Sequence, residues 1–313
     1  MARARRVIDA TKMGDHALRL IGSTDIDGKG THHEIAAIDP IVLFDFVEID
    51  TSVASAFRPH PHVGLTAMSF LPARGSWMAW DSLEGESDRR LEAGGLYYVH
   101  AGTPAFHHEF PSPDTVAAGI EVEFIQLVWN ATDEEEVRTV VLQPDEVPVV
   151  PFEQGSMRVL AGDFFGASAH QPFTHRKIIY AYVQLDIGGH MTCEVPSSMR
   201  GMLFLIEGAL AVDGTAVEAR QMLVLGEDES AAEGESDGNK TLQITNHDAD
   251  HSARFILALG EPVNKPFHKL LGLGGFIIGE TEEALRASMA DLELAAEDVK
   301  REVPQYFPAQ YLS

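Results

Sequence analysis

Short apolar runs separated by turn residues dominate the first half of the chain. Val, Ile, Phe, Tyr and Trp recur in these runs, and Gly, Pro and Asp lie between them. Such runs are typical of β-strands. They span residues 38–49, 64–71, 77–80, 95–100 and 119–130. Strands this short, at roughly 8–12-residue spacing, indicate a sandwich or a barrel.

A second series of short apolar runs follows a break in this pattern. The break contains Pro144, Pro148 and Pro151, and it indicates a linker between two domains. The later runs span residues 157–161, 178–185, 201–212, 221–225, 241–245 and 254–259. The pair Asp213-Gly214 suits a hairpin turn within them. The two series suggest a duplicated all-β architecture, with domains at 1–143 and 156–262, a linker at 144–155 and a C-terminal segment at 263–313.

The C-terminal segment changes to helical periodicity. Thr281 can cap a helix whose first turn holds Glu282 and Glu283, where negative charge is favoured. Apolar residues then recur at three- and four-residue steps, at Leu285, Met289, Leu292, Ala296 and Val299. This spacing predicts an amphipathic helix that packs on a core and closes near Pro304. The Gly-rich residues 272–275 lack the spacing of a phosphate-binding loop.

Composition narrows the class of protein. The 313 residues carry a formal net charge of -25, which repels a phosphate backbone and argues against direct nucleic-acid binding. Cys193 is the only cysteine, so an intrachain disulfide and a thiolate zinc cluster are excluded, and we expect its side chain to be buried.

No window approaches the roughly 18 apolar residues that span a bilayer. No apolar run follows the basic residues 1–6, so we expect neither a secretory signal nor membrane insertion, and we expect a cytoplasmic protein. The acidic residues 227–239 are expected to form a solvated loop.

Two short stretches combine metal-capable side chains at strand spacing. His60 and His62 are separated by one residue, as are His107 and Glu109. Alternate residues of a strand face the same side, so two neighbouring strands would bring three imidazoles and one carboxylate to one point. That donor set suits a first-row metal ion. The prolines at positions 59 and 61 place His60 and His62 at a strand start or a sheet edge.

The other histidines are weaker candidates. His108 is expected to face away from such a site, and His100 is a possible pocket group without a clear role. We expect the pair His32-His33 and the stretch 246–251 to form loops. In the second series no ligand pair precedes the run at 201–212, where residues 197–200 read Ser-Ser-Met-Arg. One domain would therefore carry the metal.

These residues resemble the pirin family of the cupin superfamily. The specific match is Pro59-His60-Pro61-His62-X-Gly64, followed by Ala101-Gly102-X-X-X-X-His107-X-Glu109-Phe110-Pro111. Further matches are Asp39-Pro40, Asp81-Ser82 and Gln126-Leu127-Val128-Trp129-Asn130, and near the C-terminus residues 260–264, 275–278 and 281–292. The similarity therefore covers most of the chain.

The resemblance implies two cupin-type double-stranded β-barrels, a bicupin, with one metal ion in the N-terminal barrel. It implies iron(II) as the ion, although other first-row metals are possible, held by His60, His62, His107 and Glu109. Some pirins cleave flavonols such as quercetin with dioxygen. On that hypothesis Glu109, the only carboxylate of the set, is also the catalytic base that accepts a hydroxyl proton. Phe70, Trp80 and Phe106 are candidate aromatic walls for a small aromatic substrate.

Other pirins act as regulators through protein contacts, so a non-catalytic protein that binds a protein partner is the alternative hypothesis. A third hypothesis keeps the barrels but leaves the metal site empty or structural. For the oligomeric state we expect a monomer.

The chain also departs from the family pattern. Val63 and Thr66 stand where Arg and Glu are usual, Gly95 stands where Asp is common, and Tyr98-Val99-His100 replaces Trp-Met-Thr. The surroundings of a metal site orient its ligands and set pocket polarity, so we expect these departures to alter the pocket around the ligands.

Overall fold

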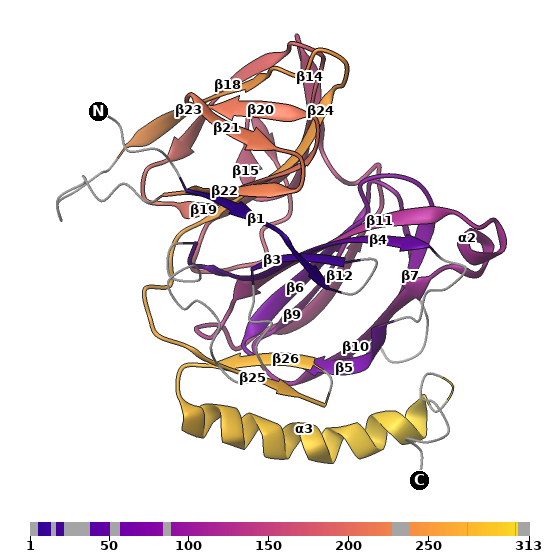
Figure 1. The fold of residues 1–313 in the computed structure, drawn as a ribbon. Helices are drawn as coiled ribbons and strands as arrows, with labels where there is room; N and C mark the ends of the chain where they lie inside the picture. Colours follow the sequence, from indigo (N-terminus) through magenta and orange to yellow (C-terminus); the bar gives the residue numbers. More distant parts are fainter. Residues whose placement is uncertain are drawn as a thin grey trace. The chain divides into compact units, whose positions relative to one another are not determined.

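The structure is a computed structural model that describes residues 6–13, 17–21, 38–50, 57–83, 89–226, 238–273, 275–303 and 305 (Figure 1). The predicted loop at His32-His33 and residues 227–237 of the predicted acidic loop lie outside the described residues. The chain forms two compact units. We call Met1–Met13, Leu18–Phe44 and Val147–Val263 the C-barrel, and Gly14–Ala17, Asp45–Glu146 and Asn264–Ser313 the N-barrel.

The C-barrel is built from two facing antiparallel sheets. One has the order β1-β22-β19-β24-β17-β14-β13, and the other has the order β18-β23-β20-β21. Their apolar faces enclose a core that includes Leu203, Leu257 and Phe255. The strands are β1 (Val7–Asp9), β13 (Val149–Phe152), β14 (Gly155–Ala161), β17 (Ile178–Leu185), β18 (His190–Pro196), β19 (Arg200–Glu207), β20 (Ala209–Val212), β21 (Thr215–Glu218), β22 (Gln221–Leu225), β23 (Asn239–Asn246) and β24 (Ala253–Gly260), with a small pair β15 (Asp163–Phe164) and β16 (Ala167–Ser168).

The N-barrel has the same plan. One sheet has the order β5-β10-β7-β8, and the other contains β12-β9-β6-β11-β4. Trp77, Tyr97 and Phe124 belong to the core inside it. The strands are β4 (Ile41–Asp50), β5 (Phe57–His62), β6 (Leu65–Phe70), β7 (Ser76–Asp81), β8 (Arg89–Glu92), β9 (Leu96–Ala101), β10 (Ala105–Pro111), β11 (Glu121–Asn130) and β12 (Val137–Leu142). Near the N-terminus of the chain lie β2 (Thr11–Met13) and β3 (Ala17–Ile21).

Most predicted strands are present, and β17 and β22 have the predicted bounds. Asp213 and Gly214 form the predicted hairpin turn between β20 and β21. Both have positive φ, 47° and 81°, as a two-residue turn of this twist requires.

The structure differs from the sequence analysis in two local details. The predicted linker at 144–155 contains β13, which pairs with β14 at the edge of its sheet, where prolines are tolerated. The short helix α2 (Pro113–Ala117) precedes β11 and was not predicted; the Ser112 side chain caps it by accepting a hydrogen bond from the Thr115 N–H.

The compact units also have different bounds from the predicted domains. The start of the chain belongs to the C-barrel, because β1 pairs with β22. The end of the chain belongs to the N-barrel, where the hairpin of β25 (His268–Gly272) and β26 (Gly275–Gly279) lies between α3 and β5 (Figure 1). Neither assignment has a signal in local composition, since both depend on long-range pairing.

The predicted C-terminal helix is α3 (Glu282–Glu302). Its N-cap is Thr281, whose side chain accepts a hydrogen bond from the Ala284 N–H at 3.1 Å. Among its buried side chains are the predicted Leu285, Leu292, Ala296 and Val299. No helix in the described ranges combines the length and the apolar character that crossing a membrane demands.

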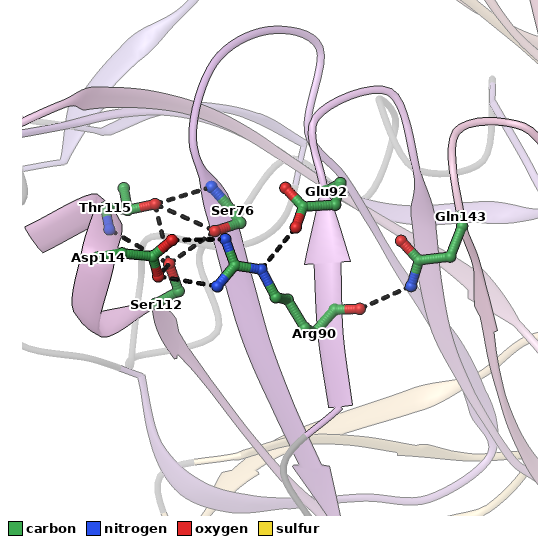
Figure 2. Close-up of polar contacts among 7 residues, drawn as sticks. All are labelled: Ser76, Arg90, Glu92, Ser112, Asp114, Thr115 and Gln143. Atoms are coloured by element: carbon green, nitrogen blue, oxygen red, sulfur yellow. Dashed lines mark hydrogen bonds and ion pairs between the residues drawn. The ribbon is translucent and has the colours of Figure 1, made fainter.

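A polar network ties together the end of the N-barrel at which β10 finishes (Figure 2). The Arg90 guanidinium donates to both carboxylate oxygens of Asp114 at 2.8 and 2.7 Å, and Gln143 donates to the Arg90 carbonyl at 2.7 Å. Ser76 bonds Ser112 at 2.6 Å, which links β7 to the residue that caps α2. Arg90 holds the pKa of Asp114 well below its usual range. The network therefore fastens α2 and β8 at this end of the barrel.

Cys193 provides a test of the C-barrel core. Its thiol is free and only 2% exposed, and burial raises its pKa to about 12, with Asp213 and Glu194 adding to the rise. A raised thiol pKa leaves little thiolate at pH 8. We therefore expect alkylation by iodoacetamide at pH 8 to be at least about a thousandfold slower in native protein than in urea, as followed by mass spectrometry. Comparable rates in the two states would contradict this burial.

Candidate metal centre

Strands β5 and β10 bring the two predicted ligand stretches together. They are antiparallel neighbours, and His60 lies directly opposite His107, while His62 lies opposite Ala105. Strand β5 is at the edge of its sheet, as the two prolines predicted. The prediction that the two stretches occupy neighbouring strands is therefore confirmed.

Three imidazole rings converge between these strands. The Nε2 atom of His107 lies 2.9 Å from the Nε2 atom of His62 and 2.9 Å from that of His60. The possible ligand atoms of all three lie within 4.8 Å of one another. Among the described residues, these three histidines form the group of side chains that could together hold a metal ion. His107 is 0% exposed and His62 4%, whereas His60 is partly exposed, so His60 marks the accessible side.

The electrostatic surroundings keep the buried rings neutral. Burial, and secondarily the charge of His60, lower the pKa of His62 to about 3, although its hydrogen bond to the Phe276 carbonyl opposes this. Burial also lowers the pKa of His107 well below its usual value, and the neighbouring histidines add to the effect. A neutral imidazole is the form that binds a metal ion.

The spacing of the nitrogen atoms suits a metal ion. Two donor atoms at right angles about an ion, each about 2.1 Å from it, are about 3.0 Å apart. The Nδ1 atom of His62 lies 2.8 Å from the carbonyl oxygen of Phe276. Because a carbonyl only accepts, Nδ1–H donates and Nε2 of His62 presents a lone pair to the other rings.

Glu109 places a buried carboxyl group beside these rings. Its Oε2 lies 3.5 Å from Nδ1 of His107, the ring nitrogen that does not contact His60 or His62. Burial raises the pKa of Glu109 to about 8, which Ser69 only partly offsets, and neither carboxylate oxygen makes a hydrogen bond of standard geometry within the described chain. A nearby cation would offset the cost of burying this carboxylate. Direct ligation by Glu109 stays a prediction.

The structure also places polar residues beside the site that the sequence analysis did not predict there. Asp81 is the cross-strand partner of His107 on β7, and it forms an ion pair with Arg89. Tyr97 stacks against the His107 ring at a centroid distance of 6.1 Å, and Arg89 lies 5.7 Å from the centre of the Tyr97 ring. These residues come from separate strands, so their proximity has no signal in the spacing of the sequence.

His108 faces away from the site as predicted. Its ring stacks on Phe110 at 4.7 Å and is only 5% exposed, so it is a buried residue of the opposite strand face.

His100 is not at the metal centre either. Its Nδ1 lies 2.7 Å from the Thr66 hydroxyl, and these residues are cross-strand partners. They alternate with Ala67 and Val99, and Val99 belongs to the barrel core, so the pair lies on the other face of that sheet.

Two of the three predicted aromatic walls, Trp80 and Phe106, need correction. Trp80 and Phe106 pack with Val63, Ile277 and the apolar face of α3, outside the barrel interior. They alternate along their strands with the residues that point inward, so alternation puts them on the wrong face for a pocket wall. Trp77, Tyr97 and Phe124 occupy the interior instead.

Comparison with known proteins finds similarity to pirins. The family described as the Pirin C-terminal cupin domain matches residues 180–295. Human pirin is 26% identical over 261 residues, which cover 81% of this chain and 81% of pirin. The chain is therefore similar to pirins over most of its length.

Solved structures confirm the bicupin fold. A quercetin 2,3-dioxygenase from Acinetobacter baumannii superimposes with a TM-score of 0.75 at 18% identity, covering 94% of this chain and 97% of that chain. The bacterial pirin YhhW from Escherichia coli, in complex with nickel(II), gives a TM-score of 0.57 at 14% identity, covering 82% of this chain and 99% of that chain. At these identities the likeness shows the fold.

Three features of this chain bear on its similarity to the pirin family. The match to the C-terminal cupin domain runs through the hairpin β25–β26 into α3, yet both elements belong to the N-barrel. The unusual Val63 is buried against Ile277 and α3. The departures from the family pattern at Thr66 and His100 form the buried hydrogen bond away from the metal centre described above.

Proposed function

We propose that this protein is an iron(II)-dependent dioxygenase that acts on a flavonol-like or other phenolic substrate. The observation that carries the proposal is the convergence of three neutral imidazoles beside a buried carboxylate. The similarity of fold to a quercetin 2,3-dioxygenase supports the choice of reaction.

In this proposal His60, His62, His107 and Glu109 hold the ion. When bound, iron(II) supplies Lewis-acid and one-electron chemistry to the site. Glu109 also accepts the hydroxyl proton of the substrate, since it is the carboxylate base of the set and its surroundings favour the protonated form that results.

The interior of the N-barrel limits how a substrate can enter. Trp77, Tyr97 and Phe124 are each 1% exposed or less, and they belong to the apolar core inside the barrel. His60 is the partly exposed member of the cluster. A planar phenolic substrate would therefore approach from the His60 side, with its hydroxyl directed toward the ligands.

Oxygen uptake tests the proposal. Iron(II)-loaded protein is expected to consume dioxygen when quercetin is added, as measured with an oxygen electrode. At matched iron occupancy, Glu109→Gln is expected to lower kcat by about 100-fold or more, because general bases contribute about 10²- to 10⁴-fold. No turnover with several metals and several flavonols would overturn the dioxygenase proposal. Metal binding without turnover, with metal-dependent binding of one protein partner, would favour the regulatory alternative.

A further inference from the structure

The C-terminal hairpin β25–β26 docks directly on the strand that carries two of the proposed ligands. Val63, the residue after β5, forms a parallel β-bridge with Ile277. The Ile278 N–H donates to the Val63 carbonyl at 3.0 Å. The hairpin therefore continues the hydrogen bonding of the ligand strand.

Two glycines allow the backbones to approach this closely. A Cβ atom on Gly275 would lie 1.9 Å from the carbonyl oxygen of Pro61, and one on Gly64 would lie 2.4 Å from that of Ile278. Gly64 also has φ of +69°, a conformation that favours glycine. A single methyl group at Gly275 must push the hairpin and β5 apart, since the atom it meets belongs to the backbone.

This close approach places a carbonyl group on His62. The Phe276 oxygen accepts the Nδ1–H of His62 at 2.8 Å, across 214 residues of sequence. That contact selects one tautomer and fixes the rotation of the ring, which leaves Nε2 directed at His107 2.9 Å away. The hairpin thus determines which nitrogen of His62 is available.

The helix α3 holds the hairpin in place. Leu285 and Leu292 of α3 belong to one apolar cluster with Ile277 of the hairpin and Val63 beside β5. The cluster continues through Ala296 and Val299. The position of His62 therefore depends on a segment that packs from outside the barrel.

We propose that the hairpin β25–β26 is a positioning element of the metal centre, and that metal binding and the docking of the hairpin with α3 are energetically coupled. The coupling rests on the proposed metal centre. It is reciprocal: a bound ion stabilises the docked hairpin, and displacement of α3 by a partner weakens metal binding. Phe276 acts through His62 and is a positioning residue.

The first test uses the full chain with Gly275→Ala, and Gly238→Ala as the matched control, because a Cβ at Gly238 meets no atom within 4 Å. In metal-free wild-type protein, ¹⁵N NMR is expected to find His62 as the Nδ1–H tautomer. In Gly275→Ala we expect a mixture of tautomers and nickel(II) affinity reduced by about 10- to 100-fold, the usual cost of losing an orienting partner. The control is expected to match the wild type in both measurements.

The second test needs no substitution, so it stands if Gly275→Ala does not fold. Nickel(II) added to the wild-type protein is expected to slow hydrogen exchange of the Ile278 amide and of α3. Unchanged exchange, together with unchanged nickel(II) affinity in Gly275→Ala, would overturn the coupling alone. A wild-type protein that binds no first-row metal would overturn the metal centre and the coupling together.

Discussion

His107→Ala is expected to lower the affinity for nickel(II) and iron(II) by more than about 100-fold, beyond the 10- to 100-fold cost of losing an orienting partner. His107 is the central member of the cluster, because its Nε2 lies 2.9 Å from the Nε2 atoms of both other histidines. Its removal leaves two imidazoles on an edge strand. Titration calorimetry and the metal content of the purified protein measure the effect.

His108→Ala is the matched control for this prediction. His108 is the next residue of β10 and is also buried, but it stacks on Phe110 on the opposite strand face. We expect this variant to lose stability and to keep its metal affinity. Equal metal content in wild type and His107→Ala would remove His107 from the ligand set. A loss of metal affinity in His108→Ala as large as that in His107→Ala would contradict the assignment of these two residues to opposite strand faces.

Leu292→Ala is expected to destabilise the N-barrel by about 2–5 kcal/mol, the range measured for deleting a buried leucine side chain. Leu292 is 0% exposed, and it packs in the cluster that joins α3 to Ile277 and Val63. Hydrogen exchange of α3 and the hairpin during denaturation measures the loss within this unit. A single melting temperature is less informative, because two compact units can unfold separately.

Leu294→Ala provides the same substitution two residues further along the same helix. Leu294 is 75% exposed, so its truncation is expected to change stability by no more than about 0.5 kcal/mol. Equal effects of the two substitutions would mean that α3 does not bury the face described here. If metal binding is coupled to the docking of the hairpin and α3, Leu292→Ala also weakens nickel(II) binding, whereas Leu294→Ala does not.

The Cys193 thiol and the metal-site histidines illustrate one physical effect with different consequences. Burial disfavours the charged form of each group, so it raises the pKa of the thiol and lowers the pKa values of His62 and His107. The thiol becomes unreactive as a result. The imidazoles are kept in the neutral form that a metal ion requires.

Local rules account for the parts of the structure that could be predicted. Alternation along a strand puts His60 and His62 on one face and separates His107 from His108. A two-residue turn with positive φ explains Asp213-Gly214, and three- and four-residue steps explain the buried face of α3. Each of these signals comes from residues within a few positions of one another.

The sequence by itself determined many of the strands, the C-terminal helix and the candidate ligands, because side-chain chemistry and short-range periodicity encode them. Only the tertiary structure decided that the end of the chain joins the N-barrel, that Tyr97 and Asp81 border the site, and that the Phe276 carbonyl orients His62. Every residue has a backbone carbonyl, so residue type cannot show in advance which carbonyl will orient a ligand. Its role arises from two glycines that let strands distant in sequence come close enough to bond.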